Sequence, residues 1–254
     1  MHGRVGDPWR GIRGNLLLRS LAPQDAVVMR KCLKRVVHRR GDTLSVGEAA
    51  TAGRVYFPET LVVRLAGTGS DSCIGLVGLE GAVCWESLFG ASLCGQRAKV
   101  EMGGSALAMS CDRLRAATAA SPTLAASLVR FTQTLTIQMG RTIVSNLNDS
   151  MEARISGWLL MLHDRIEGDE VRITHRSLAA LLNVRRASVT DALHLIEGER
   201  ALHCTRGRIV IRNRALLQSL AGSAYGLTEA AYRSAIGPFG KPAAVENGPM
   251  AAAN

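Results

Sequence analysis

The sequence is poor in aromatic residues and contains no long apolar run. Phe, Trp and Tyr make up 4% of its 254 residues. The longest apolar stretches, such as residues 158–162, are far shorter than the about 18 residues that a membrane-spanning helix requires. No small-residue cleavage site follows an apolar core near the N-terminus, although an arginine-rich transit peptide stays open as an alternative to a cytoplasmic protein. We predict a cytoplasmic protein without a membrane segment.

Metal-binding and catalytic spacings are absent as well. The six cysteines lie at wide, irregular intervals without a C-x-x-C pair, which argues against a zinc ribbon and predicts reduced, mostly buried thiols. The six histidines include no H-x-x-x-H pair, and neither a phosphate-binding glycine loop nor a Ser-His-Asp order occurs. We therefore expect no metal, no cofactor and no enzymatic activity.

Positive charge, in contrast, is abundant. The chain contains 31 Lys and Arg against 21 Asp and Glu, a net charge of +10 and a pI of about 10.0. Such a charge favours a polyanionic partner, either nucleic acid or an anionic membrane surface. Ten basic and two acidic residues fall within the first forty, where apolar patches predict a short helical lead-in broken at Pro23. We expect residues 1–15 to form a flexible arm.

Residues 16–120 are predicted to contain a β-roll. Short β-prone stretches at residues 36–37, 55–57, 61–65, 74–77, 98–101 and 106–109 alternate with glycine-rich turns. Many short strands separated by such turns are typical of a β-sandwich or a barrel-like roll.

Residues 121–150 are predicted to form one long helix. Within it, residues recur at alternating steps of four and three, which is the spacing of a coiled-coil seam. The seam consists of Leu124, Leu128, Phe131, Leu135, Gln138 and Thr142. A seam that is exposed beyond the roll needs a partner, so we predict self-association through these residues. The alternative is a core helix packed on its own domain.

Residues 151–222 are predicted to form a winged helix-turn-helix. Thr174 can cap a helix over residues 175–182, Asn183 can adopt a left-handed turn, and a second helix begins at about Arg185. Two brief strands at residues 202–204 and 208–212 are joined by a turn at Gly207. The remaining residues, 223–254, are expected to be a tail that is largely disordered at its Pro-, Gly- and Ala-rich end.

Arginine is concentrated in this segment. Residues 172–214 hold nine Arg, no Lys and three acidic residues. Arg186 is predicted to read bases, because arginine pairs bidentately with guanine, and Arg206 flanks the wing tip. The full predicted DNA-binding set is Arg176, Arg185, Arg186, Ala187, Ser188, Thr190, Asp191, His194, Arg206 and Arg208. The alternative is a solvated face with scattered salt bridges.

Over roughly residues 15–222 the chain resembles the cyclic-AMP receptor protein and Fnr (Crp/Fnr) superfamily of bacterial transcription regulators. The resemblance rests on residues 40–42 (RGD), 55–58 (VYFP), 75–81 (GLVGLEG), 182–190 (LNVRRASVT) and 206–211 (RGRIVI), together with the long helix. It implies an α+β fold with an N-terminal double-stranded β-helix (jelly-roll) effector domain, a dimerisation helix and a C-terminal winged helix-turn-helix. It also implies a homodimer on palindromic promoter DNA and RNA polymerase as a further partner.

The chain departs from the family's effector sites. Members that bind cyclic nucleotides carry a Gly-Glu pair for the ribose and an Arg-Ser/Thr-Ala run for the phosphate, whereas the matching positions here are Gly81, Ala82, Arg97 and Ala98. Because each lost buried polar partner costs about 1–3 kcal/mol, we do not expect cyclic AMP as the effector. The N-terminus has only Cys32, and we expect neither an iron–sulfur cluster nor haem.

The sequence therefore predicts a homodimer that binds DNA sequence-specifically and regulates transcription without cyclic AMP. Ala187 and Asp191 stand where the best-known family members place Glu and Arg, which predicts an unfamiliar half-site. Two alternatives stay open. The first is a sensor or adaptor whose roll binds another ligand and whose helix-turn-helix is a docking module. The second is a basic peripheral membrane protein that acts through residues 1–40. The exposed arginine face favours DNA as the partner, because a protein-docking module would not require such a face.

Overall fold

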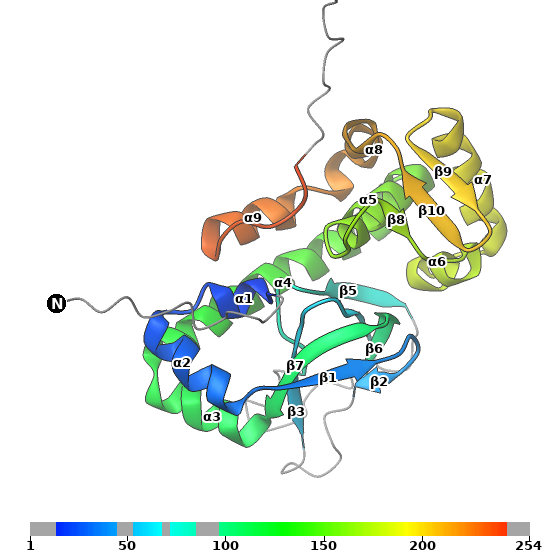
Figure 1. Ribbon diagram of the computed structural model, residues 1–254. Helices are drawn as coiled ribbons and strands as arrows, with labels where there is room; N and C mark the ends of the chain where they lie inside the picture. Colours follow the sequence, from blue (N-terminus) through cyan, green and yellow to red (C-terminus); the bar gives the residue numbers. More distant parts are fainter. Residues whose placement is uncertain (1–13, 45–52, 68–71, 85–96, 243–254) are drawn as a thin grey trace, which may run out of the picture.

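Two antiparallel sheets make up the N-terminal half of the computed structural model, which describes residues 14–44, 53–67, 72–84 and 97–242 (Figure 1). The first sheet has the order β1 (Lys34–His38), β7 (Gly104–Ser110), β3 (Arg54–Pro58). The second has the order β2 (Thr43–Leu44), β6 (Arg97–Met102), β4 (Val62–Ala66), β5 (Cys73–Val77). Each of the six predicted β-prone stretches falls largely within one of these strands, and the predicted roll is confirmed.

Buried side chains from both sheets fill the inside of the roll. Phe57, Val63, Val100 and Leu107 are at most 4% exposed and belong to one cluster. Gly104 begins β7 where the chain passes under Thr60, and a Cβ atom there would lie 2.7 Å from the Thr60 carbonyl oxygen. This close approach of two backbones requires glycine at position 104.

Three helices lie beside the roll: α1 (Leu16–Arg19), α2 (Pro23–Cys32) and α3 (Cys111–Ala120). Asn15 caps α1, and its Nδ2 donates to the carbonyl oxygens of Pro58 at 2.9 Å and Gly81 at 2.8 Å. The prediction of a flexible arm is therefore wrong for residue 15, because this buried side chain ties α1 to the roll. Residues 1–13 lie outside the described part of the chain.

Helix α4 (Pro122–Asn148) is the predicted long helix and spans about 40 Å. It begins at Pro122, which suits the first turn, and Ser121 caps it by accepting from the Leu124 backbone N–H. All six residues of the predicted seam are buried within the chain itself. Leu124, Leu128, Phe131 and Leu135 join the core of the roll. The expectation of an exposed seam is therefore wrong, because the roll and the C-terminal segment cover that face.

The C-terminal half contains a winged helix-turn-helix. It comprises α5 (Met151–His163), β8 (Glu170–Val171), α6 (His175–Leu182), α7 (Arg186–Gly198), β9 (Leu202–Thr205), β10 (Arg208–Ile211) and α8 (Arg214–Ala221). Its small sheet has the order β8, β10, β9. Its core is continuous with the outside of the roll, since Val62, Cys73 and Leu76 pack in the same buried cluster as residues of α5, α6 and α7.

The segment after α8 is ordered as far as residue 242. A 3₁₀ turn (Gly222–Ala224) leads into α9 (Leu227–Ala235), which packs along α4. Phe239 is 5% exposed. The prediction of a tail from residue 223 is therefore wrong up to residue 242, because Tyr232 and Phe239 enter the core; residues 243–254 lie outside the described part. Within the described residues no helix is long and apolar enough to span a membrane.

Candidate nucleic-acid interface

Local interactions build the helix-turn-helix as its sequence predicts. The Thr174 hydroxyl accepts from the Ser177 backbone N–H at 3.1 Å and caps α6. Asn183 ends that helix with φ 54° and ψ 50°, a left-handed conformation that Asn tolerates. Helix α7 follows, with Arg185 as its N-cap residue. These predictions of cap, turn and helix start are confirmed.

Helix α7 has one buried face and one exposed face. Val189, Ala192, Leu193 and Ile196 are at most 1% exposed and pack in the C-terminal core. The opposite face presents Arg186, Ala187, Asp191 and His194 to solvent, with Ser188 and Thr190 partly covered. The predicted residues of this helix thus lie on one accessible surface.

The wing adds further arginines. Gly207 forms the tip between β9 and β10 with a φ of 76°, a conformation that side-chain-bearing residues rarely adopt. Arg206 and Arg208 are exposed on either side of the tip. The Arg208 Nη1 lies 3.6 Å from Glu170 Oε2 across the small sheet. Arg206 is consequently the less restrained of the two.

Four of the predicted arginines carry uncompensated charge. Within the described part of the chain, the side chains of Arg176, Arg185, Arg186 and Arg206 form no hydrogen bond or ion pair with another residue. A protein that neutralises phosphates through such side chains releases the counterions of DNA, and this release dominates non-specific affinity. The surface is therefore suited to the DNA backbone as well as to base edges.

Two histidines next to this surface were not predicted. His175 Nδ1 lies 3.1 Å from Thr190 Oγ1, and so joins α6 to the exposed part of α7. Burial and the neighbouring Arg186 lower the pKa of His175, which favours the neutral form of its ring. His203 Nδ1 lies 2.7 Å from Glu197 Oε1, and Glu197 also accepts from the Cys204 backbone N–H. No spacing in the sequence indicates these pairings, because each joins two separate elements.

The surroundings of the predicted effector residues do not identify a ligand. Ala82 and Ala98 are buried in the core of the roll, whereas Arg97 is exposed at the start of β6. Gly81 lies beneath Phe131, and a Cβ atom there would come within 2.3 Å of two ring carbons. Residues 85–96, between the two predicted pairs, lie outside the described part. The effector site stays a prediction.

The face of α4 that points away from the roll has its own regular pattern. Ala126, Val129, Gln133, Thr136, Gly140, Ile143 and Leu147 follow one another at alternating steps of three and four, and all are exposed. Val129, Ile143 and Leu147 are 60%, 58% and 77% exposed. We call these seven residues the outer face of α4. It has the seam spacing of a coiled coil and contains no charged residue.

Known proteins that are similar to this chain have the same architecture. The model of the Crp-like helix-turn-helix domain matches residues 153–220. A putative transcriptional regulator of the Crp/Fnr family from Eubacterium rectale is 15% identical with a TM-score of 0.60, the alignment covering 81% of this chain and 97% of that one. FixK2 from Bradyrhizobium japonicum is 18% identical with a TM-score of 0.60, over 74% and 96% of the two chains. A CRP-family transcriptional regulator from Thermus thermophilus is 21% identical with a TM-score of 0.61, over 76% and 98%.

No curated protein matches the chain. The matched domain begins inside α5 and ends inside α8, so it contains the arginine-bearing helix and the wing. The chain therefore carries a Crp-like helix-turn-helix domain, and its fold is similar to that of solved Crp/Fnr-family structures, in agreement with the resemblance that its sequence indicated.

Proposed function

We propose that this protein is a transcription regulator that binds DNA sequence-specifically as a homodimer. The observation that carries the proposal is the set of four arginines on α6, at the start of α7 and on the wing that have no partner among the residues that the structure describes. Arg186 stands at the first position of α7, the end that enters the major groove in helix-turn-helix proteins. Arg185, Arg206 and Arg176 are placed to contact phosphates around it.

The second copy would pack on the outer face of α4. This face is apolar or uncharged along seven positions, whereas the seam that we first predicted is occupied within the chain. Gly140 has open space beside it, which would let two helices approach closely. A parallel pair of such helices would place two recognition helices on one side of the dimer and explain a palindromic site.

The effector of this regulator would not be cyclic AMP. The proposal rests on the apolar Ala82 and Ala98 at the positions of the family's polar nucleotide contacts, and on the Phe131 ring that covers Gly81. Addition of cyclic AMP should leave DNA affinity unchanged. RNA polymerase is the further partner that the family resemblance suggests.

Selection of duplexes from a random double-stranded DNA pool, followed by fluorescence anisotropy, tests the proposal. We expect enrichment of a two-fold symmetric sequence with half-sites about one helical turn apart. The affinity should fall steeply with salt, with a slope of about −0.9 for each phosphate contacted.

Equal binding of selected and scrambled duplexes at every salt concentration would contradict the proposal and favour a docking module instead. Arg113→Ala on α3 is the matched control, because it removes the same charge from an exposed position on the roll. It should leave both affinity and salt slope unchanged.

A further inference from the structure

The chain beyond α8 joins the two halves of the molecule. Residues after 220 lie outside the matched Crp-like domain. Helix α9 nevertheless runs back along α4 toward the roll, and the residues after it return toward α5 (Figure 1). We call residues 225–241 the C-terminal strap.

One contact of the strap is with the roll. The Tyr232 hydroxyl donates to the backbone carbonyl oxygen of Glu80, in the turn after β5, at 2.7 Å. Tyr232 and Phe239 belong to the buried cluster that fills the roll, and their ring centroids are 5.0 Å apart. Two large aromatic side chains therefore fasten the strap to the N-terminal half.

Further contacts of the strap are with the winged-helix half, at the residue after α5 and in the turn that follows it. The Asp164 carboxylate accepts from the Tyr225 hydroxyl at 2.6 Å and from the Lys241 backbone N–H at 2.9 Å. Lys241 Nζ also donates to the carbonyl oxygen of Gly168. The two ends of the strap thus bind one carboxylate, which in turn accepts from Arg214 inside the domain.

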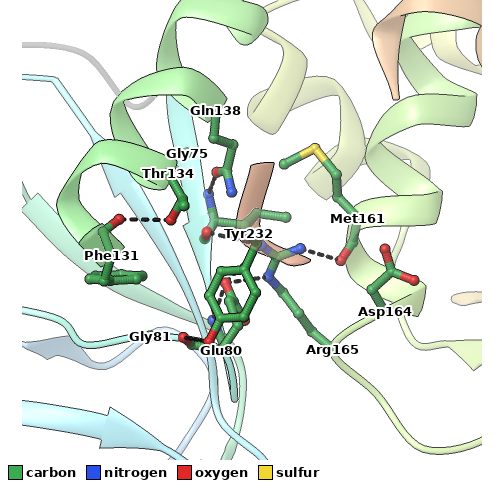
Figure 2. A network of polar contacts seen from close by, with 12 residues as sticks. Gly75, Glu80, Gly81, Phe131, Thr134, Gln138, Met161, Asp164, Arg165 and Tyr232 are labelled. Carbon is green, nitrogen blue, oxygen red and sulfur yellow. Dashed lines mark hydrogen bonds and ion pairs between the residues drawn. The ribbon is translucent and has the colours of Figure 1, made fainter. Parts of the chain in front are cut away.

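A buried ion pair lies between these contacts and crosses from one half to the other. Arg165 Nη2 and Nε donate to Glu80 Oε1 at 2.7 and 3.0 Å, as Figure 2 shows for the surrounding network. Both side chains are nearly inaccessible to water. The guanidinium carbon of Arg165 lies 5.2 Å from the centroid of the Phe239 ring. Since an ion pair attracts more strongly away from water, the cover that Phe239 provides strengthens the link.

We propose that the C-terminal strap is an interdomain fastener that holds the winged-helix domain in one orientation on the roll by covering the Glu80–Arg165 pair. It contacts the turn at residues 78–81 from one half and the end of α5 from the other. Release of the strap would admit water to the ion pair and let the two halves move relative to each other. The proposal does not rest on DNA binding, because it concerns contacts within one chain.

Hydrogen–deuterium exchange of the full-length protein tests it. The combined variant Tyr232→Phe and Phe239→Ala removes the hydrogen bond to Glu80 and the cover over Arg165. We expect exchange to rise by about tenfold or more at residues 76–81 and 161–168 together, and to stay unchanged in α7, because local openings have their own free energies. Leu227→Ala, at a 60% exposed position of α9, is the matched control and should change neither region.

A second variant, the chain ending at Gly226, removes the strap beyond Gly226 and should show the same two regions of raised exchange. Unchanged exchange at residues 76–81 and 161–168 in the point variant would overturn the proposal. So would a uniform rise over the whole chain, which would indicate a loss of general stability.

Discussion

At the scale of single residues, Arg186 and Arg206 have the same charge and different surroundings. Arg186 begins α7, whereas Arg206 lies at the wing tip. We expect Arg186→Ala to cost about 1–3 kcal/mol and to relax the preference at one base pair, because it removes a base contact. Arg206→Ala should weaken binding to all duplexes alike and reduce the salt slope by about 1. Anisotropy titrations with single-base variants of the selected site measure both, and identical behaviour of the two variants would contradict the assigned roles.

His163 gives the fold a dependence on pH. Its Nδ1 accepts from Arg214 Nη1 at 2.9 Å and its Nε2 lies 2.9 Å from Asp169, so the ring is neutral. Burial lowers the pKa of His163, although the hydrogen bond to Asp169 opposes the shift. The unfolded chain takes up this proton below about pH 6.5, whereas the folded protein takes it up only at a lower pH. The free energy of unfolding should therefore fall as the pH drops from 7.5 to 5.5.

Urea unfolding at the two pH values measures this change. His163→Gln should show a smaller drop between them, because it removes the group whose protonation favours the unfolded chain. His194→Gln, at an exposed position of α7, is the control and should keep the fall in stability of the natural sequence. If the free energy of unfolding of His163→Gln falls as much as that of the natural sequence, other groups cause the pH dependence.

At the scale of elements, helix α4 has two faces with the same residue spacing. One face is buried within the chain, and the outer face is the proposed dimer interface. Ile143→Asp combined with Leu147→Asp puts charge on the outer face and should give monomers in sedimentation velocity without a loss of fold. Leu135→Ala, on the buried face, should instead cost about 2–5 kcal/mol of stability, because it leaves a cavity in the roll. Dimers that persist in the first variant would exclude the outer face as the interface.

At the scale of the whole molecule, the Glu80–Arg165 pair makes the two halves depend on each other. Arg165→Met leaves the Glu80 carboxylate buried without its counter-charge and should destabilise the protein by about 3–5 kcal/mol. Glu80→Gln in the same chain should recover part of this loss, since no isolated charge is then left. Denaturant unfolding of the single and combined variants gives the coupling between them. A loss below about 1 kcal/mol in Arg165→Met would contradict the importance of the pair.

The strap and the proposed dimer make a joint prediction. A fixed orientation of each winged-helix domain would fix the distance between the two recognition helices. The chain ending at Gly226 should therefore bind a single half-site as well as the full chain does, but discriminate less between half-site spacings. Exchange measurements on the same variant separate failure of the strap from failure of DNA binding.

The sequence by itself determined the parts that depend on near neighbours. Thr174 caps the helix that it precedes, Asn183 allows the turn that follows it, and Gly207 allows the wing tip. Each involves residues a few positions apart, so composition and spacing suffice to predict them. The arginine face follows from the same local pattern, because the period of α7 decides which side chains share a side.

Only the tertiary structure decided which partner each surface meets. Both faces of α4 have seam spacing, and the period of a helix cannot tell which one the roll will cover. The Pro- and Gly-rich end predicted disorder, yet Phe239 within it is buried, as is Tyr232 shortly before it, in a chain that is poor in aromatics. These rings contact Glu80 and Arg165, which are far away in sequence. The contacts form only when the two halves of the molecule pack against each other.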